Sequence, residues 1–89
     1  MPISVKETVE ELNAMRVRSD ELAQDVAGMR ASLKKDTKML VSLVRGSRAG
    51  DQAIAALQST ERALAAAGAS MSALAQTCKE SAEAVLESR

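Results

Sequence analysis

The stretch Arg45-Gly46-Ser47-Arg48-Ala49-Gly50-Asp51 decides how this 89-residue chain folds. Its glycines suit the left-handed C-cap of one helix, and Ser47 and Asp51 are residue types that cap the start of another. No other part of the sequence has so strong a turn signal. We therefore predict a turn at about residues 45–50 between two helices. The expected turn residues are Val44, Arg45, Gly46 and Gly50.

The segment before the turn is predicted to be one helix over about residues 4–44. It opens with Ser4 and, three residues later, Glu7, which is the spacing of a capping box. Large apolar residues then recur in alternating steps of three and four, if Ser19 and Asp36 are accepted as polar members. This is the 3.5-residue period of a coiled-coil seam. The expected packing residues are Leu12, Leu22, Val26, Met29, Leu33 and Leu40.

The segment after the turn is predicted to be a second helix over about residues 51–87. Its apolar stripe has the same period, with Glu61 and Gly68 as weak points, and either Leu74 or Ala75 fits one of its steps. Cys78, the only cysteine, is expected to be a small apolar member of this stripe. A reactive thiol and an intermolecular disulfide remain as alternatives for it. The expected packing residues are Ile54, Leu57, Leu64, Met71 and Cys78.

Two helices of similar length joined by a short turn make an antiparallel hairpin. We predict an all-α chain with a single domain over residues 1–89. A chain this small, with neither a disulfide nor a metal, needs further packing to be stable. Apolar residues off the main stripes widen the apolar face, so the hairpin is expected to join a four-helix bundle or to pack on partner helices. These extra apolar residues are Val17, Met39, Val41, Val44 and Leu86.

Charge is balanced but unevenly placed, with 12 basic and 12 acidic residues. Basic residues gather near the turn, whereas acidic residues gather near the chain ends. Two hairpins laid antiparallel would bring opposite charges together and so steer association. The simpler interpretation is a solvated surface. A zero net charge and the absence of aromatic residues argue against a nucleic-acid binder, which needs excess basic residues and stacking platforms.

The residue types of common catalytic and metal sites are scarce. The chain has no histidine, which is the most frequent general base and metal ligand. Neighbouring acids such as Glu10 and Glu11 belong on a helix surface rather than in a pocket. We expect no enzymatic activity, no metal and no cofactor. No run is apolar enough to insert stably in a membrane, and the charged N-terminus is unlike a signal peptide. We therefore expect a cytoplasmic protein, or one exported without a cleaved signal.

The layout resembles the WXG family of small type VII secretion proteins. Those are helical hairpins of about this length with a Trp-x-Gly turn at mid-chain, and they pair antiparallel as four-helix homodimers or heterodimers. Here Val44-Arg45-Gly46 occupies the place of Trp-x-Gly, so Gly46 matches the motif and Val44 does not. The family's second mark, an aromatic residue followed four positions later by an acid, is missing near the C-terminus. The chain is thus more similar to the Trp-less α-helical partners of LXG toxins in Gram-positive bacteria.

This resemblance implies a non-enzymatic partner or targeting factor. Such a protein would bind the helical region of a larger secreted effector, or another small hairpin, in the cytoplasm before export with it. The competing hypothesis is a homo-oligomeric coiled coil that serves as a structural or scaffold protein. A homo-oligomer should be stable and homogeneous alone, whereas a heteropartner should gain stability only with its target.

Overall fold

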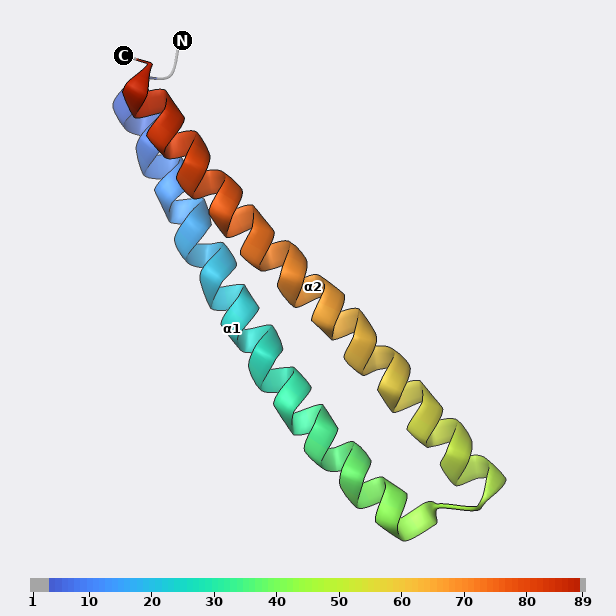
Figure 1. Cartoon of the computed structure of the whole chain (residues 1–89). Helices are drawn as coiled ribbons and strands as arrows, with labels where there is room; N and C mark the ends of the chain where they lie inside the picture. The colour runs from blue at the N-terminus through green and yellow to red at the C-terminus, as the bar shows by residue number, and fades with distance from the viewer. Residues whose placement is uncertain (1–3, 89) are drawn as a thin grey trace.

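The chain forms two long helices packed side by side in the computed structural model, which describes residues 4–88 (Figure 1). Helix α1 spans Val5–Val44 and helix α2 spans Arg48–Glu87, each with 40 residues. The start of α1 and the end of α2 lie together at one end of a rod 63 Å long, and the turn lies at the other. The predicted antiparallel hairpin is therefore confirmed, while residues 1–3 and 89 lie outside the described part.

The start of α1 is capped by a hydroxyl group, as the sequence predicts. Ser4 has extended backbone angles, and its Oγ accepts a hydrogen bond from the Glu7 N–H at 3.1 Å. The Thr8 hydroxyl also donates to the Ser4 carbonyl at 3.0 Å. The bond from the Glu7 N–H satisfies a donor that the first helical turn leaves unpaired, so α1 begins at the predicted place.

The turn is shorter than expected, because α2 begins at Arg48 rather than near residue 51. Ser47, and not a later residue, is the N-cap: its Oγ accepts from the Gly50 N–H at 2.9 Å, and its carbonyl accepts from the Asp51 N–H at 2.9 Å. Gly46 has φ +95°, the left-handed conformation that a side chain would strain. The sequence therefore placed the left-handed glycine correctly but started α2 three residues too late.

Gly50 is needed for a different reason from Gly46. It lies buried in the first turn of α2, directly against the end of α1. A Cβ added at Gly50 would lie 2.6 Å from Ser47 Oγ and 2.7 Å from Val44 Cγ2, and closer still to the Val44 carbonyl oxygen. Only a residue without a side chain permits this approach, so Gly50 sets how closely the two helices meet at the turn.

Two close approaches fix the alignment of the helices. A Cβ at Gly68 would lie 3.3 Å from Val26 Cγ1, and Gly50 meets Val44 as described. Because the helices are antiparallel and rise equally per residue, equal steps from these pairs give the other layers of the seam, the strip of contact between α1 and α2. The layers inferred are Leu12 with Ala82, Arg16 with Cys78, Ser19 with Ala75, Ala23 with Met71, Arg30 with Leu64, Leu33 with Glu61, Thr37 with Leu57, and Leu40 with Ile54.

Within residues 4–88, the side chains that the hairpin buries are all small or medium-sized. Val26 is the largest of them and is 9% exposed. Burial of a large apolar side chain stabilises a fold by about 1.5–3 kcal/mol, and the hairpin obtains this only in part, since its leucines and methionines remain half-buried or exposed. The buried residues within residues 4–88 are Ser19, Val26, Gly50, Ala75, Cys78 and Ala82.

Candidate helix-docking face

The predicted packing residues of α2 all lie on the side that meets α1. Ile54, Leu57, Leu64 and Met71 are half-buried, and Cys78 is buried with a free thiol. Of the two residues that fitted one step, Ala75 is 4% exposed and Leu74 is 39% exposed. The seam of α2 therefore follows the steps expected from the sequence, with Ala75 in place and Leu74 on its flank.

The seam of α1 differs from the expected one at every second step. Leu12, Leu33 and Leu40 are half-buried and Val26 is buried, but Leu22 and Met29 are 51% and 50% exposed. At each of these steps the residue that follows the predicted one lies in the seam. In the register set by Val26 and Gly68, it is this following residue that faces α2. The residues that occupy these steps are Arg16, Ala23, Arg30, Thr37 and Val44.

The displaced apolar residues form a column on one flank of α1. Seven-residue steps keep a side chain on the same side of a coiled helix, so Met15, Leu22, Met29, Asp36 and Leu43 share this flank. Leu43 is 74% exposed and Met15 is half-buried. Asp36 is the one charged member of the column. Large apolar side chains at this spacing are typical of a surface that packs against another helix.

The adjoining flank of α2 carries no charge along its described length. Two columns of residues at seven-residue steps make up this flank, and nearly all of them are exposed. Every charged residue of α2 lies in another column. We call this flank, together with the apolar residues of the α1 column and without Asp36, the uncharged face. Its α2 residues are Ala53, Ala56, Thr60, Ala63, Ala67, Ser70, Leu74, Thr77, Ser81 and Ala84.

The opposite face of the hairpin, which we call the polar face, carries charged residues of both helices beside apolar ones such as Val17. One hollow there is lined from both helices by residues that include Arg16, Asp20 and Lys79. Farther toward the turn, Lys34 Nζ lies 3.5 Å from Glu61 Oε1, an ion pair that joins the two helices. Charged residues on this face stay hydrated, so it is a poor match for an apolar partner.

Arg30 lies between the two faces, at a seam position. Its Nε is buried and has no hydrogen-bond partner. A second hollow of the polar face includes Arg30 together with Ala27, Ala65 and Gly68. The sequence did not indicate Arg30 as a seam residue, because a hydrophobic pattern passes over a charged residue beside Met29.

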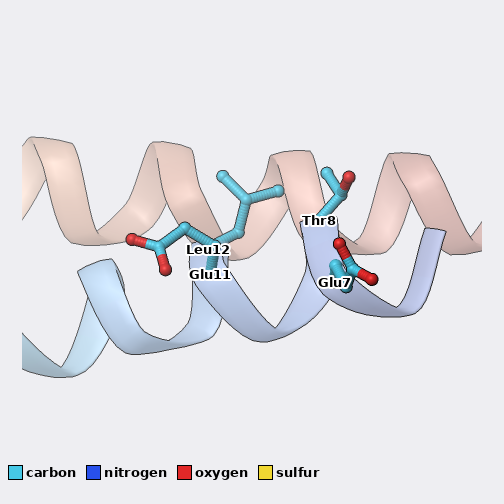
Figure 2. A pocket seen from close by; sticks show the side chains of 4 residues that line it. All are labelled: Glu7, Thr8, Glu11 and Leu12. Atoms are coloured by element: carbon cyan, nitrogen blue, oxygen red, sulfur yellow. The ribbon is translucent and has the colours of Figure 1, made fainter. Parts of the chain in front are cut away.

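A shallow hollow marks the open end of the uncharged face (Figure 2). It is lined by Glu7, Thr8, Glu11 and Leu12, all of which come from the first turns of α1. Glu11 also accepts from the guanidinium of Arg18 at 3.3 Å, and both side chains are well exposed. Exposed ion pairs contribute at most about 1 kcal/mol, so this pair marks the rim of the face more than it stabilises the hairpin.

Two other kinds of site have no support within residues 4–88. No group of three His, Cys, Asp or Glu side chains in this part of the chain is arranged to hold a metal ion. Neither α1 nor α2 contains a segment long and apolar enough to cross a membrane. The uncharged face is therefore the surface on which a functional proposal rests.

Comparisons with known proteins give no match for this chain. No family model matches the sequence, and neither the curated proteins nor the solved structures contain a match.

Proposed function

We propose that this chain is a non-enzymatic helical partner that binds the helical region of a larger type VII secretion effector and helps present it for export. The hairpin architecture and Gly46 in its turn support the resemblance to WXG-like partners. The observation that carries the proposal is that Leu22 and Met29 of α1 are half-exposed beside a flank of α2 that carries no charge.

The physical argument is that the hairpin buries too little by itself. Its enclosed residues are mostly small, whereas its large apolar residues stay partly in water. Covering a half-exposed Leu or Met removes more apolar area from water and is worth about 1 kcal/mol for each residue. A partner helix laid along the uncharged face would cover several such residues at once, which suits a protein that works by binding an elongated helical segment.

Affinity purification of the tagged protein from its native host tests the proposal. The expected result is one larger protein, with a long helical N-terminal region, recovered in a fixed ratio. That protein should be lost with Leu22→Asp, because the substitution buries an unpaired charge on the uncharged face. It should be kept with Val17→Asp, a matched control, since Val17 is 48% exposed and lines the polar face.

Secretion supplies the second measurement. If the proposal is right, deleting the chain should prevent export of the protein that it binds. Recovery of the tagged chain alone, or equal recovery of the larger protein with both aspartate variants, would reject the proposed function. A defined homo-oligomer without any partner would favour the second candidate, a homo-oligomeric coiled coil that serves as a structural or scaffold protein.

A further inference from the structure

The α1 side and the α2 side of the uncharged face differ in side-chain size, and their shapes are complementary. Its α1 side carries the large residues Met15, Leu22, Met29 and Leu43, which we call the ridge. Its α2 side is made of small residues, Leu74 apart, and we call those small residues the trough. A ridge of long side chains packs best into a row of small ones, because protein interfaces reach the packing density of protein interiors.

The residues of the ridge and the trough also correspond in their positions along the long axis of the hairpin. In the register of the hairpin, Met29 stands level with the interval between Ala63 and Ala67, and Met15 with the interval between Thr77 and Ser81. Met15 and Met29 are therefore each level with a gap between two small residues, whereas Leu22 is level with the gap between Ser70 and Leu74. Knobs that enter gaps between residues four apart are the basis of close helix packing.

We propose that a second copy of this chain covers the uncharged face, with the ridge of each copy in the trough of the other. The two copies are related by a twofold axis parallel to the helices, so both turns lie at the same end of the dimer. In this arrangement each residue and its copy in the partner lie at the same position along the axis. Each α1 lies antiparallel on the partner's α2. The inference concerns the chain alone and does not rest on the proposed function; an effector helix would bind the same face and would therefore displace the second copy.

The reverse arrangement, with the turns at opposite ends, packs less well. It would set α1 on α1 and α2 on α2, so that large residues meet large ones and small residues face small ones. Side chains such as Met29 and Leu43 would then hold the helices apart while the Ala-rich flanks left a void. Voids and forced contacts each cost about 1–3 kcal/mol.

With the turns together, the basic turn ends of the two copies lie side by side and so do the acidic open ends, so the packing of ridge into trough must outweigh this repulsion. On α1 the column outside the ridge includes Glu11, Arg18 and Asp25, and in this dimer it faces only uncharged residues of the partner's α2. Asp36 is the exception to the apolar ridge, and burying it near Thr60 weakens the dimer, since a charge taken from water needs a partner.

The area of the face is sufficient for a stable dimer. From Met15 to Leu43 the ridge is about 42 Å long at about 1.5 Å per residue. The hairpin is 21 Å wide, so each copy presents roughly 900 Å². A standard interface needs about 800 Å² from each partner.

The arrangement is tested with a spin label near the turn. The purified full chain carries Cys78→Ser and Gln52→Cys, because Gln52 is exposed and outside the uncharged face. We expect a dimer by light scattering. We also expect pulsed electron spin resonance to give a label separation below about 35 Å, since packed helix axes lie about 10 Å apart. A separation above about 45 Å, the value for turns at opposite ends of 40-residue helices, would overturn the arrangement. A monomer would overturn the proposal as a whole.

A pair of aspartate substitutions supplies an independent readout. Asp36→Leu removes the charge from the ridge and should lower the dimer dissociation constant about tenfold or more. Asp20→Leu is the control, because Asp20 lies on the same helix but lines the polar face. Equal effects of the two substitutions, or weaker dimerisation with Asp36→Leu, would contradict the proposed contact. Helix content by circular dichroism shows that each variant is folded.

Discussion

At the scale of single residues, the two glycines of the turn do different work. Gly46 supplies a left-handed backbone, and Gly50 supplies the absence of a side chain where two helices meet. The sequence identified both as turn residues. It did not show that Gly50 belongs to α2, because a glycine required for close contact looks the same in a sequence as one required for its φ angle.

Gly50→Ala should therefore lower the free energy of unfolding by about 1–3 kcal/mol, because the new Cβ would overlap the Val44 carbonyl, which is backbone and cannot turn aside. Urea denaturation followed by circular dichroism measures the effect. Gly28→Ala is the matched control: no atom lies within 4 Å of its added Cβ, so helix propensity alone acts and the variant should gain about 1 kcal/mol. If Gly50→Ala also stabilised the chain, the close approach at the turn would be wrong.

At the scale of the helices, the fold could be predicted from the sequence, whereas the seam of α1 could be predicted only in part. The hydrophobic pattern gave both helices, the antiparallel hairpin and the seam of α2. For α1 it selected Leu22 and Met29, yet Ala23 and Arg30 occupy the seam. Two adjacent columns of α1 have the same period, so periodicity cannot choose between them; the choice depends on which column meets α2. The uncharged face emerges only once that choice is known.

Substitutions at two positions one helical turn apart distinguish the seam from the uncharged face. Val26→Asp should unfold the hairpin, because Val26 is 9% exposed and a buried unpaired charge costs about 3 kcal/mol or more. Leu22→Asp should leave the helix content unchanged, since Leu22 is 51% exposed. Circular dichroism at micromolar concentration distinguishes them. Equal loss of helix in both variants would mean that the hairpin does not fold without a partner.

The ion pair between the helices should contribute little to stability. Glu61 occupies a seam position between Leu57 and Leu64 and forms an ion pair with the exposed Lys34. Glu61→Leu should raise the free energy of unfolding by about 1 kcal/mol, because added apolar burial outweighs a partly exposed pair. Lys34→Met, which removes the same pair from its exposed side, serves as the control and should change stability by less than about 0.5 kcal/mol. A marked loss of stability with Glu61→Leu would show that the pair is worth more than its exposure suggests.

At the scale of the whole molecule, the hairpin is a rod 63 Å long and 21 Å wide whose long sides differ in polarity. Association through a side thickens such a rod, whereas association through an end lengthens it. We expect X-ray scattering from the dimer to give a maximum dimension close to that of one hairpin and an increased cross-section. Leu22→Asp should return the cross-section to that of the monomer. A maximum dimension near twice the rod length would place the contact at the ends instead.

The regular layers of the seam also limit how the length of this protein can change. Every layer pairs a residue of α1 with one of α2, and the pattern repeats after seven residues on each side. Removing residues 20–26 together with residues 68–74 would leave every other pair facing its old neighbour and would shorten the rod by about 10 Å. Removing either block alone would leave one helix seven residues longer than the other, so that part of it would have no residues to pack against. Insertions and deletions in a protein built this way are therefore tolerated as matched blocks of seven, so the rod has a natural unit of length.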